Sequence, residues 1–256
     1  MDLFQSVVLG VVEGITEFLP ISSTAHLALT SMILGLEQSE FMKSFEIGIQ
    51  SGAILAVLYI YWHKLINNKQ WLIKILVAFI PTGIIGFILY GVIKSMLLSN
   101  YTVMLWSLII GGVLMILFEL LYKEKGRQTE DISDLNYVKC LYIGAFQALA
   151  VIPGVSRAAA TIIGGLLLKI NRKVIVEFSF LLAVPTMFLA TLYDLSKSST
   201  DFTSSEVVNL LVGFAVSFVV AIFAIKFLLS YIRRHNFVAF GIYRIVIALI
   251  FLLFIL

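Results

Sequence analysis

Long apolar segments restrict this chain to folds in which helices lie in a lipid bilayer. Six segments are long enough to cross the hydrocarbon layer, which takes about 20 helical residues; they cover residues 45–63, 72–93, 102–122, 176–194, 207–229 and 238–256. Hydrophobic residues make up 61% and charged residues 13% of the 256 positions, which is more apolar surface than one water-soluble core buries. The sequence therefore predicts an all-α polytopic membrane protein, with residues 1–256 as a single integral membrane domain.

Charge and cysteine content argue against several other classes of protein. The net charge of +3 is small, and no basic patch interleaved with aromatic residues lies outside the apolar segments, so nothing indicates a nucleic-acid partner. Cys140 is the only cysteine, so an intramolecular disulfide is excluded. The N-terminus lacks the basic region and the cleavage site of a signal peptide, and we expect it to be retained.

Two further apolar stretches, residues 3–34 and 141–168, are each broken in the middle by helix-breaking and polar residues. The sequence Pro-Ile-Ser-Ser-Thr interrupts the first at 20–24, and Pro-Gly-Val-Ser-Arg interrupts the second at 153–157. A proline inside a helical pattern ends or kinks the helix. Irregular backbone at membrane depth is tolerated only where protein or a water-filled cavity covers it. Each stretch is therefore predicted to be a re-entrant helix–loop–helix hairpin that enters and leaves on one side of the membrane.

The positive charges distribute unevenly between the two sides of this topology. One side receives three of the 18 Lys and Arg residues and the other thirteen, while Arg157 and Arg244 lie inside apolar segments. The poorer side carries Lys43, Lys94 and Lys197, and the richer side carries Lys64, Lys69, Lys74, Lys123, Lys125, Arg127, Lys139, Lys169, Arg172, Lys173, Lys226, Arg233 and Arg234. Because cytoplasmic loops hold the excess of Lys and Arg, both termini are expected to face outward. Arg244 is expected to extend its long side chain to the cytoplasmic interface.

The broken stretches also begin two similar halves, residues 1–123 and 137–256, joined by a loop that we expect on the cytoplasmic side. The residues matched at an offset of 134 are Gly10 with Gly144, Glu13 with Gln147 and Ser22 with Ser156. Three spans follow each broken stretch, and because three is odd, the second half would lie upside down relative to the first. Inverted repeats of this kind place a site at mid-bilayer, where the broken elements meet. The alternative is a chance match between two stretches broken by Gly and Pro.

Glu13 and Glu17 form the first group with a chemical signal. They are four residues apart, so on a helix they share a face, and two like charges so close repel each other. A hard divalent cation with oxygen ligands, Mg²⁺ or Ca²⁺, would relieve the conflict, and so would a proton. An interfacial helix with a solvated acidic face is the alternative, but apolar residues surround the pair.

Hydroxyl residues follow the first break. Ser22, Ser23 and Thr24 begin two residues after the proline, and His26 follows three residues after Ser23. Such a run at a helix N-terminus leaves backbone N–H groups free, which favours an anion. The spacing also allows a hydroxyl nucleophile beside an imidazole that acts as acid or base. A simple helix cap with a structural histidine is the alternative.

Arg157 is the sharpest single signal, since a permanently charged guanidinium in an apolar hairpin needs an anionic partner. Its planar fork matches a phosphate group, and Ser156 and Thr161 add hydroxyl donors. A structural ion pair with Glu13 or Glu17 is the alternative.

Together these groups indicate phosphoryl transfer on an amphiphilic substrate whose phosphate head enters the site while its tail stays in the bilayer. From the residues alone, the substrate is a lipid phosphate or diphosphate. A transporter or flippase of a polyprenyl phosphate lipid, which binds the same head group without hydrolysis, is the rival function. Glu46, Gln50, Glu177 and Ser179 are further polar residues that could line the pocket or pair with the arginine.

Four blocks of this sequence closely resemble the bacitracin-resistance family of undecaprenyl-diphosphate phosphatases. They are residues 13–26 (EGITEFLPISSTAH), 45–50 (FEIGIQ), 153–161 (PGVSRAAAT) and 177–185 (EFSFLLAVP). The resemblance implies hydrolysis of undecaprenyl diphosphate to undecaprenyl phosphate and inorganic phosphate at the outer face of a bacterial plasma membrane. That reaction recycles the lipid carrier of cell-wall synthesis and confers bacitracin resistance.

The resemblance also assigns roles to individual residues. Ser23 is the nucleophile, Arg157 holds the phosphates, Glu13 and Glu17 serve the divalent ion or proton transfer, and His26 assists as acid or base. The sequence departs from the family in having Ala25 where glycine is usual, and Ala158-Ala159 where Ser-Gly is usual. The oligomeric state is left open, a homodimer included.

Overall fold

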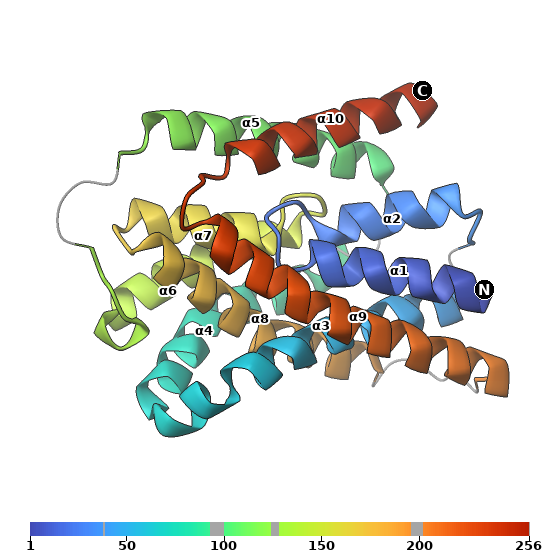
Figure 1. Cartoon of the computed structure of the whole chain (residues 1–256), viewed down its shortest axis with the longest axis horizontal. Coiled ribbons are helices and arrows are strands. Elements are labelled where there is room, and N and C mark those ends of the chain that lie inside the picture. Colours follow the sequence, from blue (N-terminus) through green and yellow to red (C-terminus); the bar gives the residue numbers. More distant parts are fainter. Residues whose placement is uncertain (38, 93–99, 124–127, 196–201, 256) are drawn as a thin grey trace.

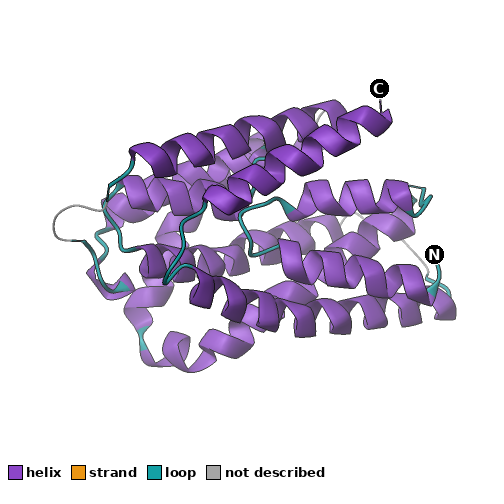
Figure 2. Cartoon of the chain, turned by 45° about the horizontal axis from the view of Figure 1, so that its top comes forward, coloured by secondary structure: helices purple, strands orange, loops and turns teal. Residues whose placement is uncertain are grey.

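The computed structural model describes residues 1–37, 39–92, 100–123, 128–195 and 202–255. Within these ranges the chain is helical, as Figure 2 shows, which confirms the all-α class. The ten α-helices are α1 (Leu3–Thr16), α2 (Ser23–Ile33), α3 (Glu40–Asn67), α4 (Lys69–Val92), α5 (Tyr101–Leu121), α6 (Tyr137–Ala148), α7 (Arg157–Leu167), α8 (Arg172–Leu195), α9 (Ser204–Tyr231) and α10 (Val238–Ile255); the short 3-10 helices are η2 (Ile132–Asp134) and η3 (Leu149–Val151). Lys94, Lys125, Arg127, Lys197 and the ends of two expected spans, 93 and 256, lie outside the described residues.

Five of the six expected spans are helices long and apolar enough to cross a bilayer. These are α3, α4, α5, α8 and α9. The sixth segment forms α10, an apolar helix of 18 residues, which is shorter than the other five. Large apolar side chains on these helices face outward, among them Phe87, Leu121 and Leu253, as expected of a surface in contact with lipid. The chain is a multi-pass membrane protein.

The two broken stretches fold as the sequence predicts, each into two short helices separated by a non-helical turn. The first consists of α1 and α2, and the second consists of α6, η3 and α7. Asp2 begins α1 with a capping box in which its side chain accepts from the Gln5 backbone N–H while the Gln5 side chain accepts from the Asp2 N–H. Asn136 begins α6 by accepting from the backbone N–H of Lys139. Two other prolines, Pro81 and Pro185, lie inside the continuous helices α4 and α8.

Each broken stretch packs against a long helix from the other half of the chain. Helix α1 lies along α9, as Figure 1 shows, and α6 lies along α4; α5 and α10 form a further pair. Glycines allow these backbones to approach closely. A Cβ atom on Gly10 would lie 2.7 Å from the carbonyl oxygen of Gly213 in α9, and one on Gly144 would collide with the carbonyl oxygen of Ala78 in α4. The two halves are therefore interlocked.

The main hydrophobic core lies around both breaks. Phe18, from the first break, packs edge-to-face against Phe180 of α8 with ring centroids 5.3 Å apart. Both side chains are fully buried. Apolar packing thus holds the two breaks close together at the centre of the molecule.

Candidate active site

A cavity of about 170 Å³ lies between the two breaks. Its wall is formed by Glu17, Ser22, Ser23, Thr24, Gln50, Ala150, Ile152, Pro153, Gly154, Ser156, Arg157 and Met187. Most of these residues belong to the two broken stretches, with one contributed by α3 and one by α8. The residues at 20–24 and 153–157 are 133 positions apart in the sequence, and they meet at one cavity, as the repeat predicts.

The same backbone conformation occurs at the end of each break. Ser22 and Ser156 both have φ of 73°, in the left-handed region that residues other than glycine rarely adopt. Each is the N-cap of the following helix, α2 or α7. The hydroxyl of Ser156 accepts a hydrogen bond from the Ala159 N–H at 3.2 Å, whereas the Ser22 hydroxyl makes no such cap. Both helix N-termini therefore reach the cavity, where their N–H groups favour an anion.

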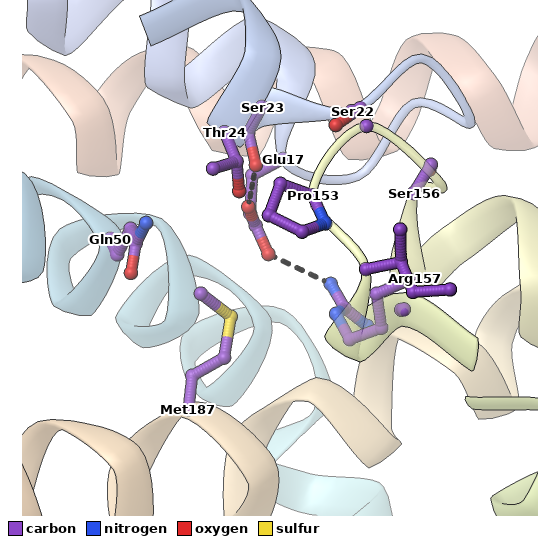
Figure 3. A pocket seen from close by; sticks show the side chains of 12 residues that line it. Glu17, Ser22, Ser23, Thr24, Gln50, Pro153, Ser156, Arg157 and Met187 are labelled. Atoms are coloured by element: carbon purple, nitrogen blue, oxygen red, sulfur yellow. Dashed lines mark hydrogen bonds and ion pairs between the residues drawn. The ribbon is translucent and has the colours of Figure 1, made fainter. Parts of the chain in front are cut away.

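Glu17 connects the proposed nucleophile with the proposed phosphate clamp. Its Oε2 accepts a hydrogen bond from the Ser23 hydroxyl at 2.5 Å, and its Oε1 lies 3.0 Å from Nη2 of Arg157. Figure 3 shows these three side chains in one line of contacts along the cavity wall. All three are largely buried, so the interactions act in a medium of low dielectric constant, where charge effects are strong.

Arg157 uses part of its donor capacity on the protein. Nη1 donates to the carbonyl oxygen of Ser179 at 2.8 Å, and Nη2 donates to Glu17. Its Nε is buried and makes no hydrogen bond to the described residues. The ion pair with Glu17 that the sequence offered as the structural alternative is thus present, and a phosphate entering the cavity would share the guanidinium with it.

Glu13 lies behind the cavity wall rather than on it. Its side chain is fully buried, and neither carboxylate oxygen has a hydrogen-bond partner among the described residues. Glu17, Glu46 and Arg157 are its charged neighbours. A buried carboxylate without a donor is costly unless it is protonated or paired with a cation, so this position is suited to hold one or the other.

His26 contacts groups other than the Ser23 hydroxyl. Its Nδ1 lies 2.7 Å from the Ser22 carbonyl oxygen, and its Nε2 lies 2.8 Å from the hydroxyl of Tyr243. With Nδ1 protonated, the ring donates to the carbonyl and accepts from the tyrosine. Both ring nitrogens are occupied in this arrangement, and Glu17 is the group in contact with the Ser23 hydroxyl.

The remaining predicted phosphate-binding residues are divided between the cavity wall and the interior. Ser22, Thr24 and Ser156 line the cavity. Thr161 is fully buried, and its hydroxyl lies 2.6 Å from that of Ser179 and donates to the Arg157 carbonyl oxygen at 2.9 Å. The structure thus places Thr161 beneath the arginine rather than beside a bound phosphate.

The alanines that differ from the family pattern lie behind the site. Ala25, Ala158 and Ala159 are buried, and none of them belongs to the cavity wall. Ala25 packs against Leu105 and Leu108 of α5.

Two residues of α10 were wrongly placed or missed by the sequence reasoning. Arg244 does not reach the interface: it is fully buried and donates to backbone carbonyls of both breaks. Tyr243 was not considered, although it contacts His26. The only signal available was a Tyr-Arg pair inside an otherwise apolar span.

Within the described ranges, no group of three or more His, Cys, Asp or Glu side chains is arranged to hold a metal ion. A cation at this site would therefore need oxygen ligands besides carboxylates, which hydroxyls, amides, backbone carbonyls, water or substrate phosphates can supply. Magnesium commonly binds in this way, through one or two carboxylates and the phosphates of its substrate.

Comparisons with known proteins give matches over nearly the whole chain. Residues 6–250 match the model of a family described as "Bacitracin resistance protein BacA". The chain is 52% identical to an undecaprenyl-diphosphatase of Persephonella marina over all of both chains. It is also 52% identical to one of Aquifex aeolicus, with 99% of each chain covered. A Methanococcus aeolicus protein of the same name is 44% identical, again over 99% of each chain.

Proposed function

This chain belongs to the family of the bacitracin resistance protein BacA, and from that premise we infer that it hydrolyses undecaprenyl diphosphate to undecaprenyl phosphate and inorganic phosphate. It is an undecaprenyl-diphosphatase. The observation that carries the assignment of the site is the contact of Glu17 with both Ser23 and Arg157 at one cavity. A hydroxyl, a carboxylate and a guanidinium from two different breaks supply the groups that phosphoryl transfer requires.

We propose that Ser23 attacks the terminal phosphorus and Glu17 accepts its proton. An oxygen–phosphorus bond forms to the serine, the bridging bond breaks, and undecaprenyl phosphate leaves. Water then attacks the phosphorus of the phosphoserine, a bond forms from the water oxygen to phosphorus, and the serine oxygen–phosphorus bond breaks. Ser23 recovers its proton from Glu17, and inorganic phosphate departs with the protons of the water. Arg157 binds the phosphate oxygens and stabilises the charge that develops on them. The 2.5 Å hydrogen bond from Ser23 to Glu17 supports this division of roles.

His26 is then proposed to orient the first break rather than to take the proton from Ser23. Its contact with the Ser22 carbonyl oxygen, at 2.7 Å, supports this role. The apolar part of the cavity wall, formed by Ala150, Ile152 and Met187, suits the start of an isoprenoid chain whose remainder lies in the bilayer.

A divalent cation, Mg²⁺ or Ca²⁺, is proposed to be held by Glu13 and Glu17 together with the diphosphate. The two unpaired oxygens of Glu13 support this proposal, since a cation would supply the missing partner. When bound, such an ion neutralises charge on the phosphates.

The finer topology is also a proposal: six membrane-spanning helices and two re-entrant hairpins in an inverted repeat. Helices α1 and α6 begin 134 residues apart, as do α2 and α7, and both breaks end in a serine with the same φ. The distribution of Lys and Arg supports a cytoplasmic location for the loop that joins the halves, and an outward location for both termini and the site. Labelling single cysteines at Lys43 and Lys123 from each side, in a chain with Cys140→Ala, tests this orientation.

The activity is tested by phosphate release from a polyprenyl diphosphate with purified protein. We expect the wild-type chain to release phosphate, and both Ser23→Ala and Arg157→Ala to abolish release. Ser6→Ala, at a buried serine of α1 that donates to the Asp2 carbonyl oxygen, is the matched control and should retain activity. Binding of the lipid without any release by the wild-type chain would favour a transporter and refute the assignment.

A further inference from the structure

Arg244 is completely buried and uses its whole donor set on backbone carbonyls. A guanidinium has five N–H donors, and here five hydrogen bonds leave it. They run from Nε to Leu108 (3.4 Å), from Nη1 to Pro20 (3.3 Å) and Val155 (3.0 Å), and from Nη2 to Ser107 (3.1 Å) and Gly154 (2.8 Å). No carboxylate of the described residues lies within ion-pair distance.

These five carbonyls come from three separate parts of the chain. Two belong to α5, one to the first break and two to the second break. Helix α10 runs beside α5, as Figure 1 shows. The fit at α5 is close, because a Cβ atom on Gly111 would collide with Nη2 of Arg244. One side chain of α10 therefore joins both breaks to a membrane-spanning helix.

Tyr243, the preceding residue, holds the first break by a second route. Its hydroxyl lies 2.8 Å from Nε2 of His26, and the two rings are stacked with centroids 5.5 Å apart. His26 in turn contacts the Ser22 carbonyl oxygen at 2.7 Å. The Tyr243–His26 pair thus fixes the carbonyl of Ser22, while Arg244 fixes the carbonyl of Pro20 two residues earlier.

The contacts at Val155 and Ser22 involve peptide groups of the two serines with left-handed backbones. Arg244 binds the carbonyl directly before Ser156, and the contacts at Pro20 and Ser22 enclose the other serine. A non-glycine residue in this conformation is strained, and it persists only where surrounding contacts hold it. Because a peptide group is planar, holding each carbonyl also sets the direction of the N–H in the same peptide.

We propose that Tyr243 and Arg244 form a positioning pair that holds both breaks in the conformation needed for hydrolysis. The pair keeps Ser22 and Ser156 left-handed, so that the next residues, Ser23 and Arg157, face one cavity. This inference rests on the proposed function, in which Ser23 attacks and Arg157 binds phosphate. Neither α10 residue lines the cavity, so both act through the backbone of the breaks.

Arg244→Met is the main test, because methionine is unbranched and apolar but lacks all five donors. A displacement of about 1 Å at a catalytic group costs about 100-fold in rate, and we expect a loss of that size in kcat. Arg244→Lys keeps the charge and up to three donors, and should recover at least a tenth of the wild-type kcat. Tyr243→Phe removes one hydrogen bond and keeps the ring, so kcat should fall several-fold.

Arg172→Met is the matched control. Arg172 is also a largely buried arginine, and it forms an ion pair with Glu119. Glu119 lies in α5, outside both breaks. We expect Arg172→Met to lower the melting temperature at least as much as Arg244→Met, yet to keep kcat within about threefold of wild type when measured well below melting. Equal losses of kcat in the two variants would mean that Arg244 only stabilises the fold, and would overturn the proposal.

Hydrogen exchange separates this proposal from the catalytic one. In Arg244→Met, or in Arg244→Lys should the first variant not fold, amides at 21–24 and 154–157 should exchange at least tenfold faster than in wild type. In Arg172→Met they should not. Unchanged exchange in the Arg244 variants refutes the positioning role. An inactive wild-type chain would refute the proposed function. Even then, faster exchange confined to the breaks of the Arg244 variants would support the inference that α10 positions the breaks.

Discussion

Replacing Glu17 by glutamine is expected to slow turnover and, at the same time, to tighten binding of the substrate head group. The carboxylate accepts from Ser23 at 2.5 Å and pairs with Arg157 at 3.0 Å. It therefore prepares the nucleophile and also occupies the guanidinium that we assign to phosphate. Glutamine keeps the shape of the side chain, but it cannot take the proton of Ser23 and it no longer competes as an anion for Arg157.

The gain in affinity for the head group and the loss of kcat have different sizes. Charges 3.0 Å apart attract by about 5 kcal/mol at an effective dielectric constant of about 20. Desolvation of the buried pair offsets much of this attraction, and the glutamine oxygen still accepts a hydrogen bond. We therefore expect about 1–3 kcal/mol of additional affinity for phosphate, or roughly 5- to 150-fold. Loss of the general base should lower kcat by about 10²- to 10⁴-fold.

Affinity is measured with a polyprenyl diphosphonate, in which a methylene group replaces the bridging oxygen and prevents hydrolysis. Measurements are made in EDTA, so that metal binding by the carboxylate does not contribute. Ser23→Ala is the matched control, since it stops turnover but leaves the Glu17–Arg157 ion pair intact, and its dissociation constant should match that of wild type. If Glu17→Gln binds the analogue no more tightly than Ser23→Ala does, the argument that Glu17 and phosphate share Arg157 is wrong.

Three further changes test other parts of the structure. Arg157→Lys should lower kcat/KM by about 10²- to 10³-fold, because one ammonium replaces a two-pronged donor and about 1.5–3 kcal/mol is lost for each charged hydrogen bond; near-normal turnover would contradict the clamp. EDTA should abolish phosphate release, and Mg²⁺ or Ca²⁺ should restore it. The Glu13→Gln variant should need more than about tenfold more metal for the same recovery. Full activity of the wild-type chain in EDTA would contradict the proposed metal. Gly144→Ala should destabilise the protein by about 1–3 kcal/mol, since its Cβ would meet the Ala78 carbonyl oxygen. Gly86→Ala, in open space on α4, is its control, and equal melting temperatures for the two variants would refute close packing of α6 on α4.

The long helices could be predicted because apolar length alone identifies them, but the effect of each proline depended on its surroundings. Pro20 and Pro153 lie in breaks, whereas Pro81 and Pro185 lie inside continuous helices. Membrane helices tolerate proline where neighbouring groups satisfy the freed backbone. The breaks were identifiable because several polar residues lie within four positions of those prolines, at 22–24 and at 156–157. A single threonine follows Pro81 and Pro185, and the next residues there are apolar or glycine.

The site residues could be predicted by type, but their contacts could not. Sequence spacing suggested that Ser23 and His26 act together, and the structure instead joins Ser23 to Glu17, six residues earlier across the break. A spacing argument assumes continuous helix, and the non-helical turn between α1 and α2 brings the carboxylate back toward the serine. The hydrogen-bond partner therefore depended on the path of the turn.

Arg244 was misplaced for a related reason. A buried arginine was expected to need an anion or a route to the membrane surface. The breaks provide a third solution, because their non-helical backbone leaves carbonyl oxygens without helical partners. These acceptors come together only when both breaks and α5 have folded around α10. No local sequence pattern predicts that they will surround Arg244.

The proposed repeat explains why the nucleophile and the phosphate clamp face each other. Ser23 and Arg157 are 134 residues apart, each is the first residue of its helix, and each follows a serine with φ of 73°. They are therefore equivalent positions in the two halves, which an inverted repeat brings together from opposite directions.

The equivalence stops at the side chains that surround them. The counterpart of Glu13 is Gln147, whose amide donates to Thr82 at 2.9 Å and Thr186 at 3.0 Å, whereas the carboxylate oxygens of Glu13 have no donor among the described residues. The counterpart of Glu17 is Val151. The first half thus holds the proposed nucleophile and the carboxylates, and the second half holds the guanidinium of Arg157. Neither half alone contains both the Ser23–Glu17 contact and the guanidinium of Arg157, so the proposed hydrolysis requires the two breaks to be held against each other.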